Sequence, residues 1–140
     1  MFKSSSLFTW WLQASRSLST SPFRLNEACI YALASGSQRS GLAVVRLSGK
    51  KSYEVLTQMT GGQKKYEPRK MYLREIVHPV TREKIDKGLV VWFKEPNSFT
   101  GENVCEFHVH GGPAVVTSLV SALGTFENLR YAEPGEFSRR

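Results

Sequence analysis

The stretch NVCEFHVHGGP, residues 103–113, contains the most regular alternation of apolar and polar residues in the sequence. Because successive side chains of a strand point to opposite faces of a sheet, this alternation predicts a strand over 103–110. The face directed toward the core carries Cys105, Phe107 and Val109. The opposite face carries Glu106, His108 and His110. The glycine pair and the proline that follow predict a helix beginning at Pro113.

The polar face of this strand has two interpretations. A carboxylate and two imidazoles at i, i+2 spacing are donor types that bind metal ions. Alternatively, these side chains form a solvated surface, since a third strong ligand is missing and Cys105 points to the other face. The backbone N–H groups of Gly111 and Gly112, at the start of the helix, are a weak indication of an anion site.

The segments around this strand predict further strands and helices. Apolar or alternating runs predict strands at 28–34, 42–47, 71–78, 87–93 and 129–132. We expect one helix between a Ser48 N-cap and Gly62, a second from Pro113 to about Leu123, and the start of a third after residue 134. Because these elements do not repeat as strict βαβ units, they predict an α+β fold with a mixed β-sheet and packed helices.

Residues 1–24 differ in composition from the rest of the chain. They contain seven serines, three basic residues and no acidic residue, and their apolar residues recur at roughly helical spacing. These features are typical of a mitochondrial transit peptide. The alternative is a secretory signal, but its apolar core, LFTWWLQA, is short and is interrupted by Thr9 and Gln13. We therefore predict a transit peptide over 1–24 and a globular domain over 25–132.

Composition fits a single globular domain: the chain has 140 residues, of which 41% are apolar. Three of its 19 basic residues and none of its 12 acidic residues precede residue 25, which leaves the remainder with a net charge of +4. Such an excess suits an anionic partner without requiring one. No apolar run approaches the roughly 18 residues of a membrane span, so we expect no membrane partner. Cys29 and Cys105 lack CxxC spacing and lie in apolar runs, which indicates buried, reduced thiols.

Two basic features indicate contact with an anion. Arg46 interrupts the apolar strand at 42–47, so its guanidinium either reaches water or clamps a carboxylate or phosphate. The stretch 64–74 combines five basic residues with Tyr66 and Tyr72. It is either a solvated loop or a surface that follows a nucleic-acid backbone. The segment SGKKS at 48–52 lacks the glycine spacing of a phosphate-binding loop, and we identify no catalytic residue.

Three segments resemble those of a known family. EPNSFTGENVCEFHVHGGP (95–113) resembles the signature of MnmE/TrmE-type tRNA-modification GTPases. GLAVVRLSG (41–49) is similar to the second strand of that family's N-terminal domain. LRYAEPGEFSRR (129–140) resembles the entry to its central helical region. Together with the transit-like leader, these segments resemble the mitochondrial member of the family.

The resemblance implies a folate site. It implies a fold similar to the tetrahydrofolate-binding domain of aminomethyltransferases, a homodimer, and a 5-formyltetrahydrofolate-type one-carbon donor bound near the dimer interface. Two folate contacts of the family fall on Arg46 and Glu106, and a third, a lysine, would lie beyond Arg140. A carboxylate such as Glu106 can accept from the adjacent N–H and amino groups of a pterin, and a guanidinium such as Arg46 can bind an anionic or carbonyl group.

For the full-length family protein, the resemblance implies GTP hydrolysis with Mg²⁺ and K⁺, an FAD-dependent partner subunit and a tRNA substrate. It implies C5 modification of the wobble uridine, of the taurinomethyl type, in the mitochondrial matrix. The printed sequence contains no GTPase motif, so we expect a chain truncated in the central helical domain, which would begin at 133–140. Such a chain would neither hydrolyse GTP nor complete tRNA modification unaided.

Three alternatives compete with a folate-binding and dimerising module. The first is a tRNA-binding module that uses residues 64–74, whose affinity would fall steeply with salt. The second is a metal enzyme that uses the polar face of the strand at 103–110. The third is a purely structural dimerisation module without folate affinity.

Overall fold

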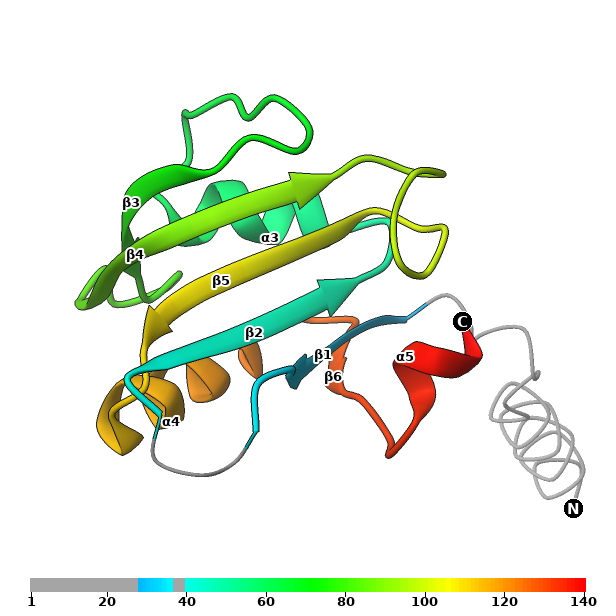
Figure 1. Cartoon of the computed structure of the whole chain (residues 1–140). Coiled ribbons are helices and arrows are strands. Elements are labelled where there is room, and N and C mark those ends of the chain that lie inside the picture. Colours follow the sequence, from blue (N-terminus) through cyan, green and yellow to red (C-terminus); the bar gives the residue numbers. More distant parts are fainter. Residues whose placement is uncertain (1–27, 37–39) are drawn as a thin grey trace, which may run out of the picture.

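The structure, a computed structural model, describes residues 28–36 and 40–140 (Figure 1). The predicted transit peptide at 1–24 and the turn residues 37–39 lie outside this part. The described elements follow in the order β1 (Cys29–Leu33), β2 (Leu42–Ser48), α3 (Ser52–Met59), β3 (Tyr72–Val77), β4 (Lys84–Phe93), β5 (Val104–His110), α4 (Pro113–Leu123), β6 (Leu129–Tyr131) and α5 (Glu136–Arg139). This succession confirms the predicted α+β class.

The strands of the described residues form one six-stranded sheet in the order β3-β4-β5-β2-β1-β6. Neighbouring strands are antiparallel except β1 and β6, which are parallel, so the sheet is mixed as predicted. Strand β2 lies between β1 and β5, which brings together segments that are far apart in the sequence. In this register Arg46 lies directly opposite Glu106.

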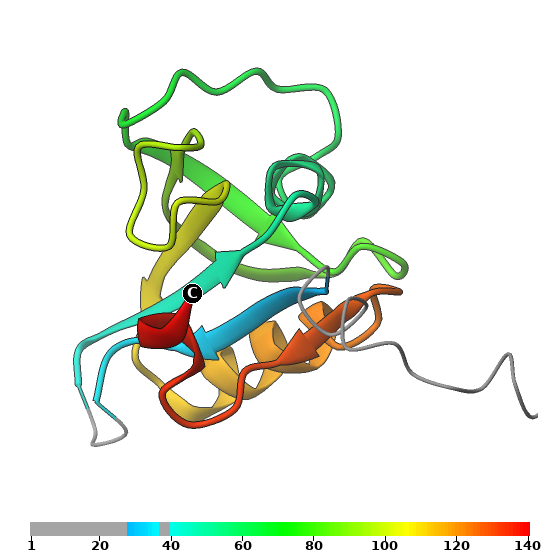
Figure 2. The ribbon, with the colours of Figure 1, turned by 90° about the vertical axis from the view of Figure 1, so that its right-hand side faces the viewer.

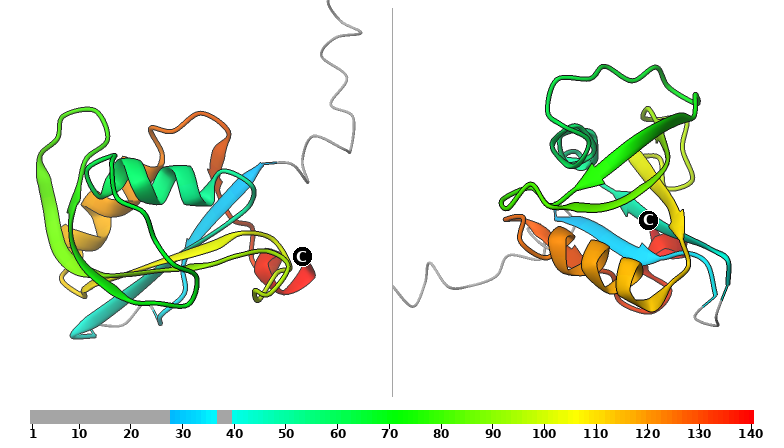
Figure 3. Two further views of the ribbon diagram at one scale, coloured as in Figure 1. Left: turned by 90° about the horizontal axis from the view of Figure 1, so that it is seen from above. Right: turned by 90° about the vertical axis from the view of Figure 1, so that its left-hand side faces the viewer.

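Helices α3 and α4 pack on the same face of the sheet (Figure 2), and Figure 3 shows them from two further directions. The core between the helices and the sheet contains Phe107, Val45, Leu56 and Leu119, all fully buried. Each such side chain contributes about 1.5–3 kcal/mol through its removal from water. Cys105, Phe107 and Val109 are buried in this core, as the alternation in the sequence predicted.

Both cysteines, Cys29 and Cys105, are buried and have free thiols. Burial raises the pKa of the Cys29 thiol and that of the Cys105 thiol above their ordinary value. These are the buried, unpaired cysteines that the sequence predicted. Among the described helices, none has the length and apolar character needed to cross a membrane.

The junction between β2 and α3 differs from the prediction. Ser48 is the last residue of β2, and its hydroxyl is hydrogen-bonded to the Thr100 hydroxyl (2.6 Å) and to the Glu102 carboxylate (2.7 Å). It therefore does not cap the helix, which begins only at Ser52 and has no side-chain cap. Gly49 makes the turn with a φ of +138°, and a Cβ there would lie 2.5 Å from the Cys29 Sγ. Strand β4 also differs from the prediction, because it begins at Lys84 rather than at Lys87.

On the other face of the sheet, the described residues form no helix of the length of α3 or α4. At the end of this face where β2 and β4 finish, two segments flank the strands (Figure 1). One is the loop 94–103, which joins β4 to β5. The other is the segment 131–138, which leads from β6 into α5. We call the whole face of the sheet opposite α3 and α4 the open face. Both predicted ligand contacts, Arg46 and Glu106, lie on it.

Candidate functional site

A row of four residues crosses the open face at the level of the two predicted ligand contacts. The strand registers place Ala32 opposite Arg46, Arg46 opposite Glu106, and Glu106 opposite Val91. Directly paired residues of neighbouring strands have side chains on the same face, about 4.5–5.5 Å apart at Cβ. The fold thus places Arg46 and Glu106, the two predicted ligand contacts, next to each other.

The two side chains form an ion pair with one oxygen of the carboxylate. The Arg46 Nε donates to the Glu106 Oε1 at 2.9 Å, and the Arg46 Nη2 lies 2.8 Å from the same oxygen. The Arg46 side chain is 27% exposed and the Glu106 side chain 13% exposed. Both side chains are therefore reachable from the open face, although most of each is buried.

His108 holds the second oxygen of the same carboxylate. Its Nε2 lies 2.9 Å from the Glu106 Oε2, and its side chain is mostly buried. An ionised carboxylate offers about four acceptor positions, and the Arg46 and His108 nitrogens use three of them. Glu106 therefore has little capacity for a ligand unless one of the two neighbours moves.

A cavity of about 510 Å³ lies next to Arg46. Its walls are Ala32–Ala34 of the β1 end, Arg46 of β2, and the whole segment 131–138. A volume of this size is within the range of small-molecule sites. Arg46 lines the cavity, whereas Glu106 lies on the other side of Arg46, outside the lining.

The wall formed by α5 is fixed through Glu136. Its carboxylate accepts hydrogen bonds from the Arg130 guanidinium at 2.6 and 2.8 Å and from the Arg140 guanidinium at 3.2 Å. The bonds from Arg130 lower the pKa of Glu136 to about 2, against the opposing effect of burial. Arg140 also donates to Glu102 at 3.1 Å, which ties α5 to the loop 94–103. The two segments that flank the open face are thus joined to each other.

Phe99 is the residue of this site that the sequence reasoning missed. It lies in the loop 94–103, its side chain is 66% exposed, and its ring centroid is 5.2 Å from the Arg46 Cζ. This geometry is that of a cation–π contact. The available signal was one large aromatic residue in an otherwise polar stretch, NSFTGE.

The second histidine of the predicted polar face belongs to a different pair. His110 is 74% exposed, and its Nδ1 and backbone N each lie 2.9 Å from the Asp86 carboxylate. These bonds, opposed by partial burial, lower the pKa of Asp86. The structure therefore divides Glu106, His108 and His110 between two pairs. Among the residues it describes, no three His, Cys, Asp or Glu side chains group to hold a metal ion.

The basic stretch 64–74 is largely folded onto the protein. Tyr66 is buried, and the Arg74 guanidinium packs over the rings of Tyr66 and Tyr72 at 5.7 and 5.0 Å. Arg69 donates to the Asn97 carbonyl at 2.9 Å. The Tyr66 ring is therefore unavailable for stacking on bases, and the Tyr72 ring is packed against Arg74, while Lys64 and Lys65 remain exposed.

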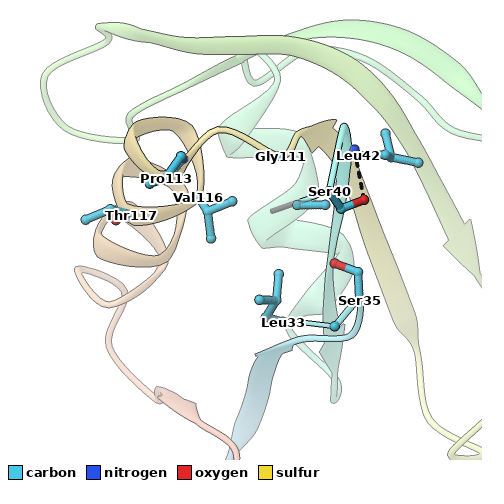
Figure 4. A pocket seen from close by; sticks show the side chains of 10 residues that line it. Leu33, Ser35, Ser40, Leu42, Gly111, Pro113, Val116 and Thr117 are labelled. Carbon is cyan, nitrogen blue, oxygen red and sulfur yellow. Dashed lines mark hydrogen bonds between the residues drawn. The ribbon is translucent and has the colours of Figure 1, made fainter. Parts of the chain in front are cut away.

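A second hollow lies at the opposite end of the sheet, between the end of β1, the start of β2 and the start of α4 (Figure 4). It measures about 250 Å³, and Leu33, Ser35, Leu42 and Val116 are among its lining residues. The Gly111 N–H, one of the donors of the predicted anion site, is bonded to the Gly41 carbonyl at 3.2 Å. Neither predicted ligand contact lies in this hollow.

Comparison with known proteins places these features in a family context. The sequence model of one protein family, described as the GTP-binding protein TrmE N-terminus, matches residues 29–140 of this chain. The chain is 50% identical over 111 residues to the 5-taurinomethyluridine-[tRNA] synthase subunit GTPB3, mitochondrial, of Danio rerio, covering 79% of the chain and 22% of that protein. It is 50% identical over 114 residues to the protein of the same name from Mus musculus, covering 81% and 23%. It is 46% identical over 114 residues to the tRNA modification GTPase MnmE of Rhodopseudomonas palustris (strain BisB18), covering 81% and 25%. The chain thus spans about a quarter of the length of these relatives.

Proposed function

This chain belongs to the family of the TrmE N-terminus, and from that premise we propose that it is the folate-binding and dimerising module of a mitochondrial tRNA-modification GTPase. The proposed ligand is 5-formyltetrahydrofolate or a related tetrahydrofolate. The proposed fold relationship is to the tetrahydrofolate-binding domain of aminomethyltransferases.

One observation carries the proposal. Arg46 and Glu106 come from strands far apart in the sequence, yet they form a partly accessible pair beside a cavity of about 510 Å³. The pterin edge of a folate presents an N–H and an amino group side by side, which a carboxylate accepts. Folates also carry carboxylates and amide carbonyls, which a guanidinium binds. The pair thus supplies complementary groups for the two kinds of polar edge in one ligand.

The hydrogen-bond count of Glu106 sets a condition on binding. Arg46 and His108 occupy about three of the four acceptor positions of the carboxylate. A pterin that uses both of its donors needs two positions. We therefore expect ligand binding to move the Arg46 guanidinium away from the Glu106 Oε1, toward the cavity that Arg46 already lines.

Dimerisation is supported by apolar side chains of the open face. Leu42, Leu73 and Leu89 are exposed there, and Leu73 and Leu89 are direct cross-strand neighbours. Adjacent exposed leucines on a sheet face are a favourable surface for a second copy of the chain. Leu89→Glu should reduce the dimer fraction in analytical ultracentrifugation, whereas the exposed hairpin variant Val80→Glu should leave it unchanged.

The remaining functions are those of the whole protein. The names of the relatives concern 5-taurinomethyluridine synthesis on tRNA, tRNA modification by a GTPase and, for the two vertebrate proteins, mitochondria. We extend these functions to a full-length protein that contains this module. That protein would modify the wobble uridine of tRNA together with an FAD-dependent partner. It would use GTP with Mg²⁺ and K⁺ and act in the mitochondrial matrix. The alternatives are a tRNA-binding module, supported by exposed Lys64 and Lys65, and a purely structural dimerisation module.

The test is calorimetric titration of the chain with 5-formyltetrahydrofolate. Arg46→Ala and Glu106→Ala should each weaken binding by about a hundredfold, because each removes a charge-assisted contact. Arg82→Ala and Glu83→Ala, in the turn between β3 and β4, are charge-matched controls and should bind like wild type. Circular dichroism checks that all variants are folded. Absence of binding by the folded wild-type chain would contradict the proposal and favour the structural module.

A further inference from the structure

The loop 94–103 is held in place on both sides of Phe99. The Ser98 hydroxyl donates to the Glu102 carbonyl, and the Thr100 hydroxyl is bonded to the Ser48 hydroxyl at 2.6 Å. Near the ends of the loop, the Asn103 amide oxygen accepts from the Glu95 N–H at 3.2 Å and from the Trp92 indole at 3.2 Å. Thr100 is thus anchored to β2 and Ser98 is bonded within the loop, while Phe99 itself is exposed.

A single exposed aromatic side chain is common on protein surfaces and by itself indicates nothing. Phe99 differs because of the group beneath it. Its ring lies 5.2 Å from the guanidinium of Arg46, the same group that is bonded to the Glu106 carboxylate. One planar, delocalised group therefore lies over the face of the Phe99 ring and directs N–H groups to Glu106.

This arrangement has a direct chemical counterpart. A 2-aminopyrimidin-4-one ring, such as the pyrimidine half of a pterin, contains a nitrogen–carbon–nitrogen unit with an amino group, which is a cyclic guanidine. Its N–H and NH₂ groups lie on one edge of a plane, as they do in the arginine side chain. Such a heterocycle can therefore make the same two contacts as a guanidinium: one with the face of an aromatic ring and one with a carboxylate.

We infer that Phe99 and Glu106 form a recognition slot for a planar guanidine-type edge, and that the Arg46 guanidinium occupies this slot until the heterocycle of the ligand displaces it. The inference rests on the proposed folate function and deepens it. In the bound state Phe99 stacks on the heterocycle, Glu106 accepts from its N–H edge, and Arg46 turns into the adjacent cavity. The slot thereby discriminates among ligands by the donors on their edge as well as by their ring.

The contribution of Phe99 is tested with variants that separate its ring from its bulk. Stacking on an aromatic side chain changes affinity by roughly fivefold to a hundredfold per ring. Phe99→Leu keeps an apolar side chain but removes the ring, and should weaken 5-formyltetrahydrofolate binding about tenfold. Phe99→Tyr keeps the ring and should stay within about threefold of wild type. Val80→Ala removes an exposed apolar side chain at the hairpin and should have no effect.

The edge is tested with two matched small probes. Pterin carries the 2-amino group, and lumazine has a carbonyl oxygen in its place. We expect pterin to bind at least about tenfold more tightly than lumazine, since the lumazine oxygen would face the Glu106 carboxylate. This preference should disappear in Glu106→Gln. The fragment p-aminobenzoylglutamate, which lacks the heterocycle, should bind Phe99→Leu and wild type equally.

The outcomes separate the two proposals. Binding of 5-formyltetrahydrofolate that is equal in wild type and Phe99→Leu would leave the folate function standing and overturn the role of Phe99. Equal affinities for pterin and lumazine would overturn the guanidine-edge slot. A wild-type chain that binds pterin in preference to lumazine, but not 5-formyltetrahydrofolate, would support the slot and overturn the folate function.

Discussion

Two arginine–glutamate pairs of similar burial flank the cavity, and they differ in geometry. In the Arg130–Glu136 pair, two guanidinium nitrogens bond to the two carboxylate oxygens at 2.8 and 2.6 Å. The same carboxylate also accepts from Arg140 and from the Glu133 N–H. In the Arg46–Glu106 pair, both guanidinium contacts share one oxygen.

This difference indicates different roles for the two pairs. A bidentate pair with further donors fixes the orientation of both side chains, and moving either one breaks several bonds at once. When both contacts of an arginine share one carboxylate oxygen, another donor can replace that arginine at lower cost. We infer that Arg130–Glu136 maintains the wall of the site, whereas Arg46–Glu106 is its exchangeable part.

The largest effect should come from breaking the bidentate pair. Glu136→Gln leaves the guanidinium groups of Arg130 and Arg140 without their shared carboxylate. We expect the free energy of unfolding to fall by about 2 to 3 kcal/mol, somewhat less than for a fully buried pair, because Arg130 is partly exposed. Urea denaturation at pH 7 measures this. The control is Glu133→Gln, which breaks the exposed pair with Arg139 and should cost less than about 0.5 kcal/mol. Equal losses in the two variants would contradict the assigned role.

The same carboxyl predicts how stability depends on pH. Hydrogen bonds from Arg130 lower the pKa of Glu136 from its usual 4.5 to about 2. A depressed pKa means that the native state favours the ionised form, so this stabilisation is present above pH 4.5 and is lost as the pH falls toward 2. The loss should amount to about 2 kcal/mol in wild type and be absent in Glu136→Gln. Asp86, whose pKa is also lowered, should contribute equally in both proteins. Denaturation series between pH 6 and 2 measure the difference in slope, and parallel curves would contradict the prediction.

The exchangeable pair should matter less for stability. Glu106→Gln keeps an acceptor oxygen for Arg46 but removes the charge of a partly exposed pair. We expect a loss of about 1 kcal/mol in the free energy of unfolding, together with loss of the ligand affinity proposed above. Thermal and urea unfolding of the same samples used for titration provide both values. A loss as large as that of Glu136→Gln would make this pair a structural element and would remove the contrast between the two.

The sequence predicted the elements well and the side-chain partners poorly. The alternation in residues 103–110 correctly placed Phe107 in the core and Glu106 on the opposite face, because strand periodicity is a local property. The contact between Arg46 and Glu106 depends on β2 and β5 being neighbours, although they are not consecutive in the chain. The expectation that both residues contact one ligand came from the family resemblance. No local pattern in the sequence indicates that they are register partners.

Two errors have the same physical origin. Ser48 has the residue type of a helix cap, but its hydroxyl is taken by Thr100 and Glu102, which come from a loop about 50 residues later. Phe99 was overlooked because its importance depends on the Arg46 guanidinium beneath it. In both cases a tertiary contact outweighs the local preference of the residue, and such contacts cannot be read from neighbours in the sequence.

The smallest expected effect concerns His108, which completes the exchangeable pair. Its Nε2 lies 2.9 Å from the Glu106 Oε2, the oxygen that Arg46 does not contact, so it helps to fix the carboxylate. His108→Leu removes this bond, and water can reach the freed oxygen because the pair is partly exposed. We therefore expect the free energy of unfolding to fall by only about 0.5 kcal/mol. His108→Gln, whose amide can donate to the same oxygen, should be indistinguishable from wild type.

Ligand affinity distinguishes a positioning role of His108 from a purely structural one, because a purely structural role would leave the affinity unchanged. If the carboxylate must be held in a fixed orientation to accept two donors, His108→Leu should weaken 5-formyltetrahydrofolate binding about threefold, and His108→Gln should restore it. The preference for pterin over lumazine should persist in both variants, since the Glu106 carboxylate is retained. A His108→Leu protein that binds more tightly than wild type would show that His108 competes with the ligand for the Oε2 position. In that case both neighbours of Glu106, and not Arg46 alone, would be the groups that the ligand displaces.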